Sequence, residues 1–200
     1  SDTVQTMGHY PLNLEELEID FVTCAAHKFH GPKGVGFLYK NKSLALKPLI
    51  EGGAQERGIR GGTENITGIA GMAQALELAD SDIENHIKQV QNLKYYMLTE
   101  LQNEIKGLEV NGETEKEKSL YTVLNLQFPN FEKQDMLLFM LDLEGIACSG
   151  GSACTAGANT GSHVLKGINS DTTRANVRFS FSRYTTKEEV DFTISKITNN

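Results

Sequence analysis

Two short segments carry the side chains best suited to covalent chemistry, an amine and a thiol. The amine, Lys28, follows the apolar run from Phe21 to Ala26 and precedes the glycine-bearing loop HGPKGVG. An amine at the end of a buried strand is partly desolvated, which lowers its pKa and favours Schiff-base chemistry. A hairpin whose lysines are simply solvated fits the same spacing, so spacing alone leaves both interpretations open. The loop does not have the glycine and lysine spacing of a Walker A phosphate loop.

The thiol is Cys154, within the run CSGGSACTAG. A loop of small residues gives a cysteine room to move and access to solvent, which suits a nucleophile better than a core position. A zinc site built from Cys148, Cys154 and His163 is a weaker alternative, because it matches no common ligand spacing and lacks a fourth ligand. Cys24 lies inside the apolar run, where packing is the simpler role.

A third candidate is Arg178, which stands between Val177 and Phe179 in an alternating stretch. The planar guanidinium binds a carboxylate through two parallel hydrogen bonds. Pairing with an internal acid explains an arginine at this position equally well.

The remaining pattern predicts the elements that position these residues. Strands are expected over 21–26, 36–39, 121–128, 146–147 and 176–182. Apolar residues at helical spacing predict a long helix from 67 to 107, with a possible break at residues 80–82, where a new N-cap would fit. Further helices are expected over 133–144 and from 186 toward the end of the chain, the latter beginning with a capping box.

Composition restricts the class of protein. The 200 residues carry a net charge of −7, which argues against nucleic acid as a main partner. No apolar run reaches the length of a membrane span, and no signal peptide opens the chain. Three cysteines are too few and unpaired for a disulfide framework. We therefore expect a globular protein in a reducing, cytoplasmic setting.

Four motifs in order resemble the cysteine desulfurases, a group of pyridoxal phosphate (PLP) enzymes in the class-V aminotransferase family. The motifs are HKFHGPKGVGFLY, GGAQERGIRGGTENITGIAG, GGSACTAG and VRFSFSRYTTKEEVD. They span nearly the whole chain. The GSAC form of the cysteine loop resembles the branch that serves general or nitrogenase iron–sulfur cluster assembly.

The resemblance implies a role for each site residue. Lys28 is similar to the lysine that holds PLP and moves the proton on the substrate carbon, and Cys154 to the nucleophile that takes the substrate sulfur as a persulfide. Arg178 resembles the arginine that binds the carboxylate of L-cysteine. Four other residues resemble cofactor ligands: Asp2 at the pyridine nitrogen, Gln5 at the phenolic oxygen, His27 at the phosphate, and Thr63 at the phosphate of the other subunit in a homodimer.

The chain departs from the family pattern at two positions and in its length. Ala25 stands where many relatives carry serine, so Thr23 or a backbone group would have to replace one phosphate hydrogen bond. Cys148 stands where relatives often have serine or a small residue. It either has no role in the reaction or acts as a resolving thiol. Family members run to roughly twice this length. We therefore expect the C-terminal half of a desulfurase, inactive alone.

The implied fold is α/β. Residues 1–66 would belong to a PLP type-I large domain with a mostly parallel sheet, 67–107 to a bridging helix, and 108–200 to a small α+β domain with the cysteine loop. The implied partner is a sulfur acceptor or iron–sulfur scaffold protein. The alternatives are a selenocysteine lyase, a class-V aminotransferase, and a sulfur carrier or interaction module without catalysis. A redox dithiol of Cys148 and Cys154 is a further alternative.

Overall fold

A computed structural model describes residues 1–130, 132, 134–150 and 162–199. The chain forms two compact units, Ser1–Asn85 and His86–Asn200. The division between them falls in the chain near the start of a long helix, whereas the boundaries expected from the sequence were at 66 and 107. The difference arises because the predicted helical region is two helices, of which the first packs within the first unit and most of the second belongs to the other unit.

The first unit is built on an antiparallel pair of strands, β1 (Phe21–Ala25) and β2 (Gly36–Lys40). Their register pairs Phe21 with Lys40 and Ala25 with Gly36, which confirms the two predicted strands. A single 3-10 turn, η1 (Ala26–Phe29), follows β1 directly. The buried core of this unit consists of Met7, Val22, Cys24, Ala26 and Phe29.

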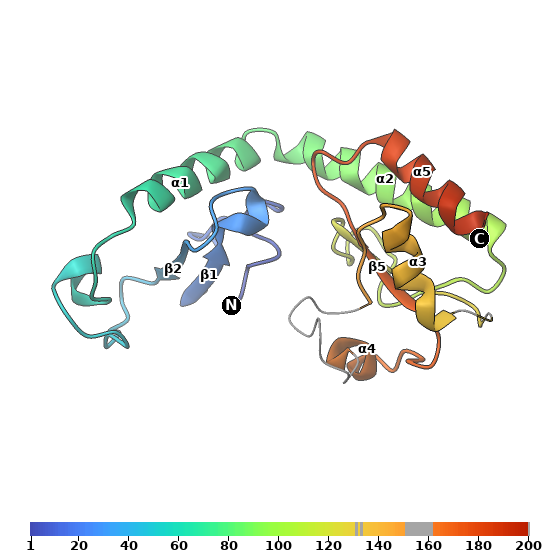
Figure 1. The fold of residues 1–200 in the computed structure, drawn as a ribbon. Helices are drawn as coiled ribbons and strands as arrows, with labels where there is room; N and C mark the ends of the chain where they lie inside the picture. Colours follow the sequence, from blue (N-terminus) through green and yellow to red (C-terminus); the bar gives the residue numbers. More distant parts are fainter. Residues whose placement is uncertain (131, 133, 151–161, 200) are drawn as a thin grey trace. The chain divides into compact units, whose positions relative to one another are not determined.

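Two helices follow a glycine-rich connection that contains the short turn η2 (Gln55–Gly58). Helix α1 (Ile66–Asp80) begins at Asn65, whose Oδ1 accepts a hydrogen bond from the Gly68 N–H at 3.1 Å. Helix α2 (Ile83–Glu104) starts after a two-residue gap, so the predicted break near residues 80–82 is confirmed (Figure 1). The chain leaves α2 through Gly107, whose φ of 86° favours glycine.

The second unit has a three-stranded antiparallel sheet in the order β3-β4-β5. The strands are β3 (Glu109–Val110), β4 (Val123–Gln127) and β5 (Asn176–Ser180). Side chains alternate along β4 and β5, and one face is apolar and buried, formed by Leu124, Leu126, Val177 and Phe179. The other face carries asparagines and Arg178.

Helices complete this unit. They are η3 (Gln134–Met136), α3 (Leu137–Leu143), α4 (His163–Gly167) and α5 (Lys187–Thr198). The predicted capping box is present, because Thr186 and Glu189 exchange side-chain and backbone hydrogen bonds at the start of α5. The predicted strand at Ile146–Ala147 is wrong. Strand-like pairing begins later, where Ser149 forms an antiparallel bridge with Arg178.

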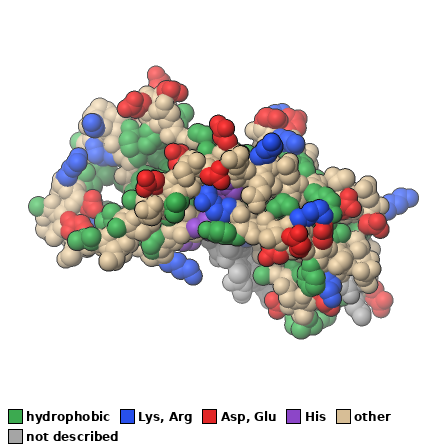
Figure 2. All heavy atoms as spheres, turned by 90° about the horizontal axis from the view of Figure 1, so that it is seen from above, with side chains coloured by type: hydrophobic (Ala, Val, Ile, Leu, Met, Phe, Trp, Pro, Cys, Tyr) green, Lys and Arg blue, Asp and Glu red, His purple; other side chains and the backbone are tan. Residues whose placement is uncertain are grey.

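The mixture of helices and strands is an α/β fold, as predicted. Among the described residues the named strands pair antiparallel, and parallel pairing is limited to the bridge between Asp2 and Thr23. Within those residues, no helix has the length and apolar character needed to cross a membrane. Acidic and basic side chains are interspersed on the face drawn in Figure 2.

Candidate active site

Lys28 lies on the turn that immediately follows β1. Ala25 is extended (φ −130°), and the chain then turns through η1, where Ala26 and Phe29 are buried. These two apolar side chains anchor the turn and leave His27 exposed and Lys28 half-buried. The sequence therefore places an amine at the end of a strand by packing its neighbours into the core.

A buried histidine from a distant segment forms a hydrogen bond to the backbone of the same turn. The Nε2 atom of His9 lies 3.0 Å from the carbonyl oxygen of Lys28. Because a carbonyl oxygen only accepts, Nε2 carries the proton and donates. Sequence reasoning missed His9, since a histidine in a turn-rich stretch gives no signal of the carbonyl it contacts.

Asp2 lies beside β1 on a parallel segment. The Thr23 N–H donates to the Ser1 carbonyl at 3.1 Å, and the Thr3 N–H donates to the Thr23 carbonyl at 2.9 Å. One carboxylate oxygen of Asp2 accepts the N–H of Val4 at 2.8 Å. The structure thus places Asp2 beside β1, the strand that leads to Lys28, and Lys28 follows five positions after Thr23, the bridge partner of Asp2.

Thr63 is exposed and follows a tightly closed loop. The Gly61 N–H donates to the Ile50 carbonyl at 2.9 Å. A Cβ on Gly61 would lie 2.9 Å from the Cα and the N of Gly52, so two backbone segments cross where only glycine fits. The two glycine pairs of the motif therefore close a loop that ends next to Thr63.

Arg178 occupies the polar face of β5 in the second unit. Its backbone pairs with Asn125 on β4 and with Ser149 on the other side. The Nε atom of Arg178 is buried and has no hydrogen-bond partner among the described residues. A buried guanidinium nitrogen without an acceptor is costly, so this arrangement suits binding of an external anion. The sequence left internal pairing open, and no ion pair to Arg178 occurs within the described part of the chain.

The structure describes two of the three cysteines, Cys24 and Cys148. Cys154 lies outside the described residues. Cys148 is half-buried, and burial, with a smaller contribution from the negative charge of Asp142, raises the pKa of its thiol. Burial likewise raises the pKa of Cys24, which lies in the core as predicted. At neutral pH both described thiols are therefore protonated and weakly nucleophilic.

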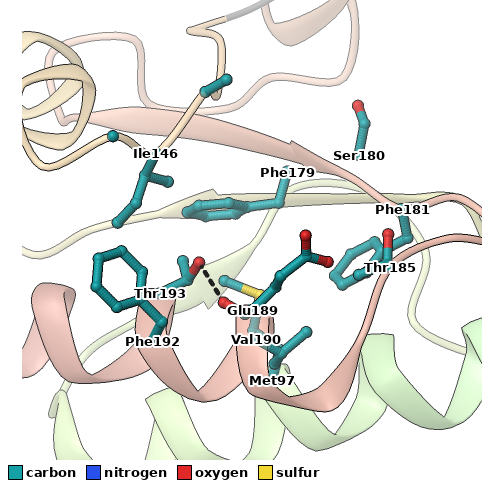
Figure 3. Close-up of a pocket in the computed structure, with 12 residues that line it drawn as sticks. Met97, Ile146, Phe179, Ser180, Phe181, Thr185, Glu189, Val190, Phe192 and Thr193 are labelled. Atoms are coloured by element: carbon teal, nitrogen blue, oxygen red, sulfur yellow. Dashed lines mark hydrogen bonds between the residues drawn. The ribbon is translucent and has the colours of Figure 1, made fainter.

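A pocket of about 310 Å³ lies in the second unit, on the side of β5 that carries Phe179 and Phe181. Figure 3 shows these rings with Met97, Ile146 and Val190 around it. Its carboxylate, Glu189, accepts the Thr186 N–H at 2.9 Å and serves the helix cap. Of the predicted site residues that the structure describes, none lines this pocket.

The predicted PLP ligands of the first unit have the chemical groups that PLP requires, and these groups are not engaged by other described residues. The second carboxylate oxygen of Asp2 and the side chains of Gln5, His27 and Lys28 have no hydrogen-bond partner within the described ranges. An acceptor for a protonated pyridine nitrogen, donors for oxygens and an amine for the aldehyde are therefore all left for a ligand.

The chain is similar to known proteins over most of its length. Residues 1–192 match the family model described as aminotransferase class-V. "Cysteine desulfurase IscS" from Dictyoglomus turgidum is 41% identical over 196 residues, covering 97% of this chain and 49% of that protein. "Putative cysteine desulfurase IscS 1" from Bacillus subtilis is 42% identical over 193 residues, covering 95% and 50%. A solved structure titled "NifS-like protein" is 38% identical with a TM-score of 0.85, covering 99% of this chain and 50% of that one.

The chain belongs to the class-V aminotransferase family. It spans about half the length of the curated relatives that it matches.

Proposed function

We propose that this chain is the C-terminal half of a PLP-dependent cysteine desulfurase, which converts L-cysteine to L-alanine and passes the sulfur on as a persulfide. One observation carries the proposal: Lys28 stands on the turn that follows β1, while Asp2 forms a parallel bridge to Thr23 of that same strand. The names of the relatives support the same reaction.

Each residue then has a defined task. PLP, when bound, withdraws electrons from the substrate carbon atoms. Asp2 would hold the pyridine nitrogen protonated, Gln5 the phenolic oxygen and His27 the phosphate. The Lys28 amine would bind the cofactor and move a proton at the substrate carbon.

The sulfur step falls to Cys154. Its thiolate would attack the substrate sulfur, forming a sulfur–sulfur bond while the carbon–sulfur bond breaks. The electron pair of the broken bond stays with the substrate, which takes up a proton and leaves as L-alanine. A thiolate of a sulfur-acceptor or iron–sulfur scaffold protein would then attack the outer sulfur of the persulfide and take it over, and Cys154 would leave as a thiolate.

The assembly and setting complete the proposal. Thr63 would reach the phosphate of the other subunit in a homodimer, and its exposed side chain beside the closely crossed Gly52 and Gly61 supports this role. The 200-residue chain alone would be inactive, because it spans only half of the relatives' length. We place the protein in the cytoplasm, where thiols stay reduced.

Turnover tests the proposal in the complete protein that carries this chain. Alanine and sulfide should form from L-cysteine in equal amounts under a reductant. Lys28→Ala should lower the rate about 100-fold or more, because a general acid–base group is lost. Cys154→Ser should abolish sulfide release, and Cys148→Ser serves as the matched control. Retention of sulfide release by Cys154→Ser would contradict the assignment.

A further inference from the structure

A row of polar side chains crosses the sheet of the second unit. Asn111, Asn125, Arg178 and Ser149 are successive partners on four adjoining backbone segments. The Asn111 N–H donates to the Asn125 carbonyl at 2.9 Å. Asn125 pairs with Arg178 in the β4–β5 register, and Arg178 pairs with Ser149. Directly paired residues place their side chains on the same face of a sheet, so all four lie on the face opposite the core.

Asn125 and Arg178 form the closer of the two kinds of antiparallel pair. The neighbouring backbone hydrogen bonds run from Phe181 N–H to the Thr122 carbonyl and from Phe128 N–H to the Ala175 carbonyl. Hydrogen-bonded pairs alternate with non-hydrogen-bonded ones, so this register makes Asn125 and Arg178 a non-hydrogen-bonded pair. Such pairs have Cα atoms about 4.5 Å apart and bring their side chains together.

A chain of hydrogen bonds fixes the orientation of the Asn125 amide. The Nδ2 of Asn176 donates to the carbonyls of Asp171 (3.1 Å) and Arg174 (2.8 Å), so its Oδ1 must accept. Asn111 donates its Nδ2 to that Oδ1 at 2.6 Å and to the Oδ1 of Asn125 at 2.8 Å. The Oδ1 of Asn125 is therefore occupied as an acceptor, and its Nδ2 is the side-chain group that this chain of hydrogen bonds does not use.

Two hydrogen-bond donors in this row have no acceptor among the described residues. The Nδ2 of Asn125 and the Nε of Arg178 have no hydrogen-bond partner in the described ranges. Neither group can accept a hydrogen bond, so they cannot satisfy each other. Two adjacent donors, one of them cationic, match the two oxygens of a carboxylate.

We propose that Asn125 is a second ligand of the substrate carboxylate, donating from Nδ2 beside Arg178, and that Asn111 is a positioning residue that fixes the Asn125 amide. The inference rests on the proposed function, because it takes the carboxylate to be that of the amino-acid substrate. It predicts that carboxylate recognition depends on an asparagine that contributes nothing to the cofactor's own chemistry.

The test measures equilibrium binding to the complete PLP-loaded protein, followed by the absorbance of the cofactor. L-alanine is compared with ethylamine, which has the same amine but no carboxylate. Asn125→Ala should raise the Kd of L-alanine about tenfold, near the lower end for a hydrogen bond to a charged group, and that of ethylamine less than about twofold. Asn125→Asp should raise the L-alanine Kd further, to about 100-fold, because it adds a like charge. Asn111→Ala should produce a smaller rise of about threefold.

Asn103→Ala, on the exposed side of α2, is the matched control and should leave both constants unchanged. Asn125→Ser gives the same comparison if the alanine variant folds poorly. Equal effects on L-alanine and ethylamine, or none, would overturn the inference. Loss of L-alanine binding in Arg178→Ala but not in Asn125→Ala would overturn it while leaving the proposed function intact. A wild-type protein that does not bind L-alanine would instead contradict the proposed function.

Discussion

The imidazole of His9 donates from Nε2 to the carbonyl oxygen of Lys28 at 3.0 Å. His9 is buried, and the bond spans 19 positions of the chain. It connects the turn-rich segment after Asp2 to the turn that carries the predicted catalytic amine. The orientation of Lys28 therefore depends on a residue outside its own motif.

Replacing His9 should loosen the Lys28 turn. His9→Ala removes the donor to the Lys28 carbonyl, and we expect a loss of about 1–3 kcal/mol in the free energy of unfolding. His9→Gln retains an N–H donor and should recover part of that loss. Urea unfolding measures both variants. Equal stability of His9→Ala and wild type would show that the bond does not hold the turn.

The crossing at Gly61 should not accept a side chain. In Gly61→Ala the added Cβ would meet Gly52 backbone, which cannot yield as a flexible side chain can. Such overpacking typically costs about 1–3 kcal/mol, and it should displace the segment leading to Thr63. Gly167→Ala is the control, because no atom lies within 4 Å of its Cβ position. Thermal unfolding compares the two, and similar midpoints would contradict the close crossing.

The thiol of Cys148 should ionise at a higher pH than the thiol of an ordinary cysteine. Burial first, and Asp142 second, raise its pKa, so the reactive thiolate forms only at more alkaline pH than for an ordinary cysteine. The rate of iodoacetamide alkylation against pH, followed by peptide mapping, reports this pKa. Asp142→Asn should move the profile to lower pH by removing a like charge, yet leave it above the ordinary value because burial remains. A wild-type profile at or below that value would contradict the buried environment.

A buried leucine on the apolar face of the second sheet should tolerate substitution less well than an exposed leucine on helix α3. Leu126 is fully buried, and Leu126→Ala should cost about 2–5 kcal/mol by leaving a cavity. Leu143, at the end of α3, is 71% exposed, and Leu143→Ala should change stability by less than about 0.5 kcal/mol. Urea unfolding compares them. Similar losses would show that the apolar face of β4 is not the core.

Much of this fold follows from local pattern. Strands β1 and β2 follow from apolar spacing. The break between α1 and α2 falls at Ser81–Asp82, among the polar residues where the sequence predicted it. The short strand expected at Ile146 was wrong because two apolar residues do not determine where pairing begins. That pairing is set by the partner strand, which bonds to Ser149 instead.

The residues of the candidate site could be predicted from the sequence, but the residues that support them could not. Lys28 and Arg178 stand in motifs that can be read along the chain, whereas Asp2 was assigned from the family resemblance alone. The histidine bound to the Lys28 carbonyl and the asparagine beside Arg178 are defined by contacts between distant segments, separated by 19 and 53 positions. Such contacts depend on register, which a single sequence does not specify.

Chemical trapping tests the central claim most directly. The complete protein is incubated with PLP and L-cysteine, alkylated to trap persulfides, reduced with borohydride and mapped by peptide mass. We predict a PLP adduct on Lys28 together with a persulfide on Cys154, and neither mark on the 200-residue chain treated alone. A Lys28 adduct without sulfur on Cys154 would indicate an aminotransferase-like enzyme instead. Absence of both marks from the complete protein would contradict the proposed function.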